Sequence, residues 1–308
     1  MAKLIRTGLG VIVVLAGVGA LTGGHPHVTH ARDPQRRPAV PRPLPASIVH
    51  RVRLGRSARG RPIGALEVGD PNARRKVLVV GCIHGNETAG IAVARRLARG
   101  TPPARVDLWL VEDLNPDGVA AGTRQNGRGV DLNRNFPWHW QPLGPRGTQQ
   151  YAGTHALSEP ESRIAHALIV RLRPAITIWF HQPLAVVDDS GGSRVIERRF
   201  ARLARLPFRR LTRYPGSAAS WQDTRLPTTT AFVVELPGGR PSAGAVARYA
   251  RAVTGVATSS RRPKLTSTSA RTATAAPDTS IGSWPSLPHA SPAQMPASSA
   301  QPPVSAWK

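Results

Sequence analysis

Two histidines and two glutamates are placed along the sequence in a way that could support hydrolytic chemistry at a metal ion. Two histidines and one carboxylate form the ligand set of catalytic zinc sites, in which a fourth coordination position stays open for water. A further carboxylate near such a site can accept a proton from that water. Each of the four residues comes just after an apolar run, and they are His84, Glu87, His181 and Glu235.

The apolar runs before these residues predict buried strands. A continuous apolar run is typical of a strand covered on both faces, whereas a 3.6-residue period indicates a helix. This alternation predicts an α/β fold with a mixed, mostly parallel sheet and helices on both faces. The four residues can converge at the carboxyl ends of the strands, although 151 positions separate His84 from Glu235. We expect strands at 76–82, 106–111, 175–180 and 230–234, and helices at 86–99, from Pro160 onward and at 194–206.

Two short segments carry specific local signals. The sequence NPDG at 115–118 predicts a turn, in which the proline sets φ and the glycine accepts a positive φ. Ser158 is expected to cap the helix that follows it, with Glu161 closing a capping box. Taken alone, the spacing of His84 and Glu87 remains a weak signal, because a histidine in a loop is usually a polar surface residue.

Length and composition bound the class of protein. A chain of 308 residues has room for one domain of about 200 residues with flanking segments. An apolar content of 40% excludes wholesale disorder, a collagen-like chain and a multi-span membrane protein. The single cysteine, Cys82, excludes an intramolecular disulfide and a cysteine-rich zinc module. The chemistry must therefore use His, Asp, Glu and Arg.

The charge comes from arginine and is strongly positive. There are 42 Lys and Arg residues against 17 Asp and Glu, a formal net charge of +25. Such a charge indicates an anionic wall polymer or membrane surface as partner, or simply a composition bias toward arginine. The arginine-rich helix at 194–206 is open to the same two interpretations. No nucleic acid is expected as a partner, because no DNA- or RNA-binding motif accompanies the charge.

Composition divides the chain into four segments. Residues 1–31 have a basic start and a thirteen-residue apolar run, which predicts a signal peptide or an uncleaved N-terminal anchor. Residues 32–47 form a Pro/Arg-rich linker, 48–256 the folded catalytic domain, and 257–308 a disordered tail rich in Ser, Thr, Pro and Ala. We therefore expect an exported protein, either secreted or associated with the cell envelope.

Six motifs occur in an order that resembles the zinc carboxypeptidase family, over roughly residues 53–236. Within that family, the stretch 213–237 is most similar to bacterial murein peptide amidases, which act on the bond between γ-D-glutamate and diaminopimelate. The motifs are VLVVGCIHGNE at 77–87, NPDG at 115–118, RQNGRGVDLNRNF at 124–136, SEPE at 158–161, WFHQP at 179–183 and FVVELP at 232–237.

The resemblance implies a role for each residue that could act on water or on the scissile amide. His84, Glu87 and His181 would bind one Zn²⁺ ion per chain. Glu235 would remove a proton from water and later deliver it to the leaving amine, which requires a carboxylate close to the metal. Arg124 falls where the family has the arginine that helps to stabilise the oxyanion.

The resemblance also implies a set of residues that hold the substrate. Asn133 and Arg134 match the pair that grips the terminal carboxylate, which suits a planar guanidinium. Asp131 matches an acid that orients the first ligand histidine. Tyr214 lies near the position of a mobile tyrosine in the digestive members, although packing in a turn would explain it equally well. The alanines near it at Ala218 and Ala219 identify no substrate.

The implied function is that of an exported zinc metallopeptidase that cuts an amide bond next to a residue with a free carboxylate. A cell-wall stem peptide is the expected substrate, at the γ-D-glutamate–diaminopimelate bond. The alternatives are a broad-specificity metallocarboxypeptidase and a non-catalytic wall-binding protein. Aspartoacylase-like deacylases share part of the pattern, but the NPDG and ELP segments favour the peptidases.

Overall fold

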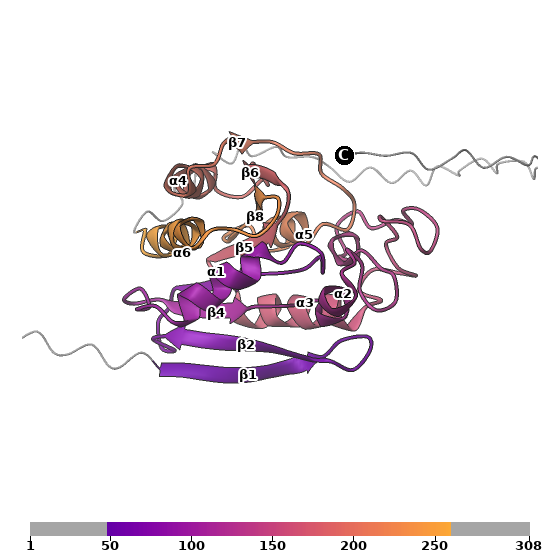
Figure 1. The fold of residues 1–308 in the computed structure, drawn as a ribbon, viewed down its shortest axis with the longest axis horizontal. Coiled ribbons are helices and arrows are strands. Elements are labelled where there is room, and N and C mark those ends of the chain that lie inside the picture. The colour runs from indigo at the N-terminus through magenta and orange to yellow at the C-terminus, as the bar shows by residue number, and fades with distance from the viewer. Residues whose placement is uncertain (1–47, 260–308) are drawn as a thin grey trace, which may run out of the picture. The chain divides into compact units, whose positions relative to one another are not determined.

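A mixed eight-stranded sheet organises residues 48–259, which are the residues that the computed structural model describes (Figure 1). The strands are β1 (Ile48–Arg56), β2 (Pro62–Gly69), β3 (Lys76–Val80), β4 (Asp107–Val111), β5 (Ile176–His181), β6 (Leu184–Asp188), β7 (Phe208–Arg209) and β8 (Thr230–Pro237). Their order in the sheet is β1-β2-β4-β3-β5-β8-β6-β7. In the centre, β4, β3, β5 and β8 run parallel, whereas the β1–β2, β2–β4 and β6–β8 pairs are antiparallel.

Helices cover both faces of this sheet and enclose two cores. The helices are α1 (Ala89–Ala98), α2 (Pro116–Ala121), α3 (Pro160–Leu172), α4 (Arg194–Ala204), α5 (Ala218–Arg225) and α6 (Ala243–Ala257), together with the 3-10 helix Leu132–Arg134. Apolar residues of α1, α4 and α6 form one core with the sheet, and those of α3 and α5 form the other. The predicted α/β class is confirmed.

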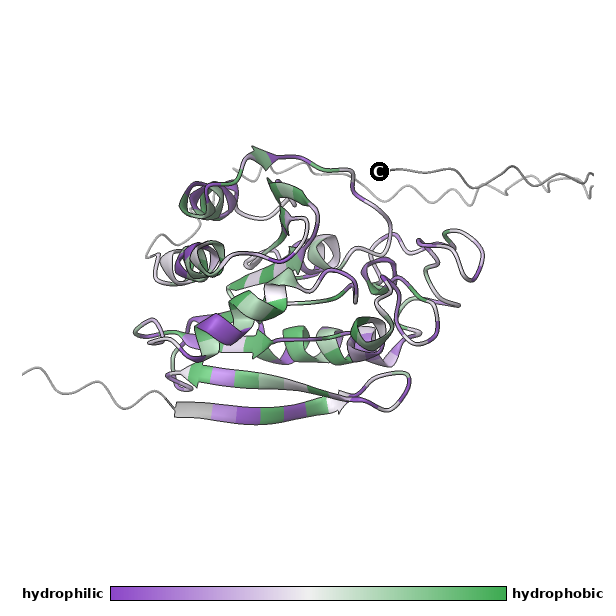
Figure 2. Cartoon of the chain, viewed as in Figure 1, coloured by the Kyte–Doolittle hydropathy of each residue, from purple (hydrophilic) through white to green (hydrophobic). Residues whose placement is uncertain are grey.

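The central strands are apolar because both of their faces are covered. All residues of β4 and β5 are buried, and so are four of the five residues of β3. The visible parts of β4 and β5 accordingly have mainly hydrophobic colouring in Figure 2. Because β3, β5 and β8 are parallel neighbours, their carboxyl ends lie side by side, and the loops that follow them can bring polar residues together.

The predicted turn at 115–118 is wrong. The segment begins α2, and the Asn115 side chain caps this helix by accepting a hydrogen bond from Gly118 N at 2.9 Å. Gly118 has no positive φ. A Cβ at this position would lie 2.5 Å from the Asn115 amide nitrogen, so the glycine is required by crowding rather than by conformation.

The predicted capping box at the start of α3 is also wrong. Glu159 holds the N-cap position without a side-chain hydrogen bond, and Ser158 Oγ donates to Glu159 Oε1 at 2.9 Å. Glu161 is buried and accepts a hydrogen bond from Ala58 N at 2.8 Å. Both side chains serve tertiary contacts that a local pattern does not reveal.

The predicted segments 1–31 and 32–47, and the tail apart from its first three residues, lie outside the described residues, so their boundaries stay predictions. Within 48–259, no helix combines the length and the apolar character needed to cross a membrane.

Candidate metal centre and active site

Three side chains converge on one point at the carboxyl ends of β3 and β5. His84 Nδ1 and His181 Nδ1 lie 3.0 Å apart, and each lies 3.0 Å from Glu87 Oε2. All three residues are buried, with exposed fractions of 1% for His84, 7% for Glu87 and 4% for His181. Within the described part of the chain, this is the one cluster of three or more His, Cys, Asp or Glu residues that could hold a metal ion.

The donor atoms of this cluster fit zinc. Two imidazole nitrogens and a carboxylate oxygen are the ligand types of a catalytic zinc site. Ligand atoms held tetrahedrally at about 2.0–2.1 Å from one zinc ion lie about 3.3 Å from one another, close to the spacing that these three atoms show. A zinc ion would also give the two facing Nδ1 atoms a common partner. His84, Glu87 and His181 are therefore the residues that would hold Zn²⁺.

The loop after β3 is shaped to turn two of these ligands inward. Glu87 N donates to His84 O at 2.9 Å, which closes a tight turn between the two residues. A Cβ on Gly85 would lie 1.9 Å from the carbonyl carbon of Gly118, so only glycine lets this loop pack against α2. The third ligand is the last residue of β5, and the next backbone nitrogen, Gln182 N, donates to Glu87 Oε2 at 3.2 Å.

Asp131 and Arg124 hold the metal ligands in place through hydrogen bonds. The fully buried Asp131 carboxylate accepts a hydrogen bond from His84 Nε2 at 2.9 Å, which leaves His84 Nδ1 as the donor atom for a metal. Arg124 Nε donates to the other Asp131 oxygen at 2.9 Å, and Arg124 Nη1 donates to Glu87 Oε1 at 2.8 Å. This is the arrangement that the sequence predicts for Asp131, whereas the bond from Arg124 to a ligand carboxylate was not expected.

This network favours the charged forms of its members. Burial opposes ionisation of Asp131, but His84 and Arg124 outweigh it and hold the pKa of this carboxyl below its usual range. Burial also opposes ionisation of Glu87, yet hydrogen bonds from His181 and His84 hold its pKa well below the ordinary value. Glu87 is therefore ionised, as a metal ligand must be.

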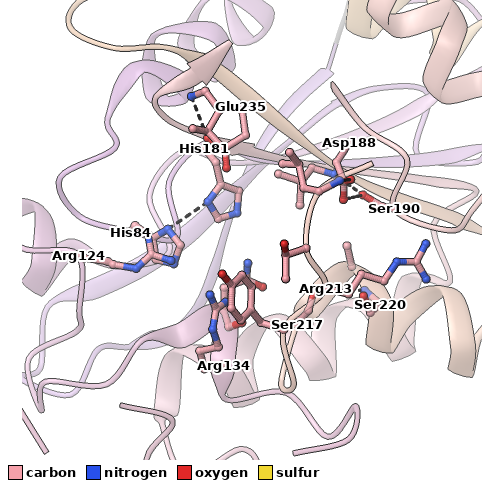
Figure 3. Close-up of a pocket in the computed structure, with 17 residues that line it drawn as sticks. His84, Arg124, Arg134, His181, Asp188, Ser190, Arg213, Ser217, Ser220 and Glu235 are labelled. Atoms are coloured by element: carbon pink, nitrogen blue, oxygen red, sulfur yellow. Dashed lines mark hydrogen bonds between the residues drawn. The ribbon is translucent and has the colours of Figure 1, made fainter. Parts of the chain in front are cut away.

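Glu235 lies beside the metal centre without an ion-pair partner. It stands opposite His181 in the β5–β8 pairing, and its side chain lines the same pocket as His84 and His181 (Figure 3). Its carboxylate accepts one long hydrogen bond, from Leu184 N at 3.5 Å. No cationic side chain of residues 48–259 pairs with it, so its carboxylate is available to the pocket.

Arg134 lines the pocket and is buried. It is 6% exposed, and its Nε is buried without a hydrogen bond within the described residues, while Nη1 donates to Asn133 O at 2.9 Å. Burial lowers the pKa of Arg134. The Tyr214 ring stacks on its guanidinium, with 4.1 Å between the Arg134 Cζ atom and the ring centroid. Asn133 Oδ1 accepts from Ala218 N at 2.9 Å, which fixes the side chain at the pocket wall.

The loop that carries Tyr214 is docked on the segment that carries Arg134. Gly216 has a φ of +76°, and a Cβ there would lie 1.9 Å from Arg134 O, so only glycine permits this approach. Phe136 N donates to Gly216 O at 3.0 Å, and Gly216 N donates to Trp138 O at 2.7 Å. The structure therefore places Tyr214 in the pocket wall, which agrees with either interpretation of the sequence, contact with substrate or packing in a turn.

The pocket continues away from the metal centre to residues that the sequence did not single out. It has a volume of about 280 Å³, and its far wall carries Asp188, Ser190 and Arg213 (Figure 3). Asp188 ends β6 and Ser190 follows it, outside the motifs of the sequence. Arg213 lies in the loop before α5 and begins the stretch 213–237, but the sequence assigned it no role. All nine residues predicted for the site lie together, because eight line the pocket or hold the metal ligands and Glu87 is itself a ligand. Their chemical roles stay predictions.

A protein family and several known proteins are similar in sequence to this chain. A family model described as zinc carboxypeptidase matches residues 44–196. Murein peptide amidase A of Escherichia coli (strain K12) is 33% identical over 181 residues, which cover 54% of this chain and 74% of that protein. Murein peptide amidase A of Vibrio campbellii is 32% identical over 206 residues, which cover 62% of this chain and 81% of that protein.

Solved structures show the same fold. The crystal structure of murein-tripeptide amidase MpaA from Escherichia coli O157 superimposes with a TM-score of 0.58 at 28% identity, covering 70% of this chain and 94% of that chain. Carboxypeptidase A from Helicoverpa armigera superimposes with a TM-score of 0.59 at 20% identity, covering 68% of each chain.

Proposed function

The chain belongs to the zinc carboxypeptidase family and is a zinc metallopeptidase, and from that premise we propose that it hydrolyses the γ-D-glutamate–diaminopimelate bond of cell-wall stem peptides. The observation that carries the geometry is Arg134, a buried guanidinium that lines the pocket beside the metal ligands and forms no ion pair within the described residues. The choice of stem peptide is supported by the similar proteins, whose names describe murein peptide amidases.

The metal and Glu235 would together activate the attacking water. When bound by His84, Glu87 and His181, zinc supplies a Lewis acid for a carbonyl oxygen and lowers the pKa of water. Glu235, whose carboxylate has no ion-pair partner among the described residues, accepts the proton of the attacking water and passes it to the leaving amine. Asp131 keeps His84 in the tautomer that can bind metal.

Three further residues would hold the substrate. Arg134 and Asn133 bind the free carboxylate of the leaving residue, because a buried guanidinium favours a planar anion. Arg124 donates to Asp131 through Nε and to Glu87 through Nη1. Its third nitrogen, Nη2, has no hydrogen bond within residues 48–259. This nitrogen is the one that would donate to the oxyanion.

The test is release of diaminopimelate from L-Ala-γ-D-Glu-meso-diaminopimelate by the zinc-loaded protein, followed by mass spectrometry. We expect release that a chelator abolishes and zinc restores. Ordinary peptides ending in Lys, Arg or Phe serve as the comparison. Hydrolysis of these peptides without release of diaminopimelate would contradict the proposal and favour a broad-specificity carboxypeptidase.

We also propose that the protein is exported, with residues 1–31 as signal peptide or anchor, and that it contacts an anionic wall polymer. The support is the apolar run at 9–21 and the exposed arginines of α4, among them Arg198 and Arg202. Cell fractionation tests export, and a protein found only in the cytoplasm would contradict it. Replacing the α4 arginines by Gln should weaken sedimentation with purified walls more than the same change at exposed Arg171 and Arg173.

A further inference from the structure

The end of the pocket away from the metal ligands holds both a positive and a negative side chain. Arg213 and Asp188 line the same pocket as His84 and Arg134, and Figure 3 shows them on the side opposite His84. Three serines also line the pocket: Ser190, which donates to Asp188, and Ser217 and Ser220. A carboxypeptidase pocket that accepted an apolar side chain would need no charged residues there, since burying an unpaired charge is costly.

Arg213 has hydrogen-bonding capacity to spare. Its Nη2 donates to Asp189 O at 3.2 Å, and its Nε is buried without a partner among the described residues. The guanidinium packs against Gly191, where a Cβ would lie 2.7 Å from Nη2, so the glycine makes room for it. No carboxylate of residues 48–259 forms an ion pair with Arg213 within 4.0 Å. Its charge acts on Asp188 and Asp223, opposing the rise that burial causes in the pKa of both carboxyls, but it forms no close ion pair with either.

Asp188 is fixed in place but retains acceptor positions. It is 8% exposed, and its Oδ1 accepts from Leu211 N at 2.8 Å while its Oδ2 accepts from Ser190 Oγ at 2.8 Å. An ionised carboxylate has about four acceptor positions, so roughly two remain for a ligand. Ser190 Oγ is held in turn by Val233 N at 3.1 Å. The Asp188 carboxylate is therefore held in place by hydrogen bonds, and it can accept further hydrogen bonds from a cation.

We propose that this end of the pocket reads the side chain of the leaving residue, and that Arg213 binds a second carboxylate there while Asp188 binds an ammonium group. A side chain that ends in both groups is itself a terminal amino acid, as in diaminopimelate. The proposal rests on the proposed function, because it assigns the pocket to the leaving residue. It gives this chain two specificity-determining residues outside the metal centre.

The two charges together discriminate against simpler side chains. A lysine side chain offers the ammonium group but leaves Arg213 without an anion. A glutamate side chain offers the carboxylate but leaves Asp188 without a cation. An unpaired buried group loses its hydrogen bonds to water without compensation, so each simpler residue is disfavoured.

The test is calorimetric binding of three free amino acids to the zinc-loaded protein, which does not depend on which peptide bond is cut. The three ligands are meso-diaminopimelate, lysine, which lacks the distal carboxylate, and 2-aminopimelate, which lacks the distal amino group. The variants are Arg213→Gln, whose amide can still donate to Asp189 O, and Asp188→Asn. Arg210→Gln is the matched control, because Arg210 is exposed and does not line the pocket.

We expect Arg213→Gln to weaken diaminopimelate binding about tenfold to a hundredfold and to leave lysine binding unchanged. Asp188→Asn should weaken binding of diaminopimelate and lysine but not of 2-aminopimelate. Equal affinity of the unmodified protein for diaminopimelate and lysine would overturn the proposal, as would an equal loss of both ligands in Arg213→Gln. If diaminopimelate binds as expected but the stem peptide is not hydrolysed, the inference stands and the proposed function fails.

Discussion

The two ends of the pocket are built in different ways. At the metal end, His84, Glu87, Asp131 and Arg124 form one continuous network in which each side chain has a bonded partner. At the far end, Arg213 contacts the protein through a single hydrogen bond and has a buried nitrogen without a partner. The difference indicates that metal binding depends on side chains fixed by hydrogen bonds to one another, whereas the choice of substrate depends on charged groups that form few hydrogen bonds within the protein.

The largest effect is expected at the metal end from His181→Ala. Loss of one of three ligands should reduce zinc from one ion per chain to a small fraction, and activity by at least ~10⁴-fold. His50→Ala is the control, because His50 is exposed on β1 and lies outside the cluster. Elemental analysis with parallel rate measurements checks this. A variant that keeps stoichiometric zinc would show that His181 is not a ligand.

A smaller loss is expected from Glu235→Gln, which keeps the shape of the side chain but removes its base. Turnover should fall ~10²–10⁴-fold while zinc content stays at one per chain. Glu112→Gln is the control, since Glu112 pairs with Arg95 outside the pocket. Near-normal turnover in Glu235→Gln would mean that another group accepts the proton.

Arg134→Ala tests the residue proposed to bind the terminal carboxylate of the substrate, which lines the pocket between the metal ligands and the far end. Removing the guanidinium should lower kcat/KM about thirty- to several-thousand-fold for a peptide with a free terminal carboxylate. This corresponds to a loss of about 2–5 kcal/mol in transition-state stabilisation. The same peptide amidated at that carboxylate should be cut slowly by both proteins, because it never used the contact. Arg128→Ala, at an exposed position, is the control. Equal rates on free and amidated peptides with the unmodified protein would contradict a carboxylate-reading site.

The two ends of the pocket also differ in how well the sequence predicts them. The metal end is predictable because His84 and Glu87 stand three residues apart and because His181 and Glu235 lie opposite each other near the carboxyl ends of neighbouring strands. Arg213 and Asp188 are not predictable in this way, since they meet only through the path of a loop and of the edge strand β6. One arginine among 38 carries no signal unless its surroundings are known.

The local errors have the same physical origin. Ser158 has the residue type and spacing of a helix cap, but its hydroxyl also accepts a hydrogen bond from the buried Asn135 amide at 2.9 Å. The β1–β2 edge and the helices α5 and α6 were not predicted, because their apolar patterns are short or mixed with small residues. Tertiary contacts decide these segments, and a local pattern does not contain them.

The smallest expected effect is on the pH dependence of stability. It comes from a buried acid, Glu197, which lies near Asp188 at the far end of the pocket. Glu197 is fully buried on α4, and neither carboxylate oxygen has a hydrogen-bond partner within residues 48–259. Burial, with the nearby Asp223, Asp189 and Asp188, raises its pKa to about 8. The folded state therefore binds a proton that the unfolded state releases above its ordinary pKa of 4.5. Stability from this group is full below pH 4.5 and is lost as the pH rises toward 8.

Glu197→Gln should remove this dependence, because Gln stays neutral at every pH. The melting temperature of the unmodified zinc-loaded protein should fall more between pH 6 and pH 9 than that of the variant, by several degrees, which corresponds to a difference of about 1–2 kcal/mol in unfolding free energy. Glu112→Gln, at a partly exposed ion pair, should leave the dependence as it is. A loss of stability in Glu197→Gln that is equal at both pH values would show that Glu197 is ionised and paired in the fold. In that case the polar groups behind the far end of the pocket would be as fully paired as those at the metal end. The difference between the two ends of the pocket would then not hold.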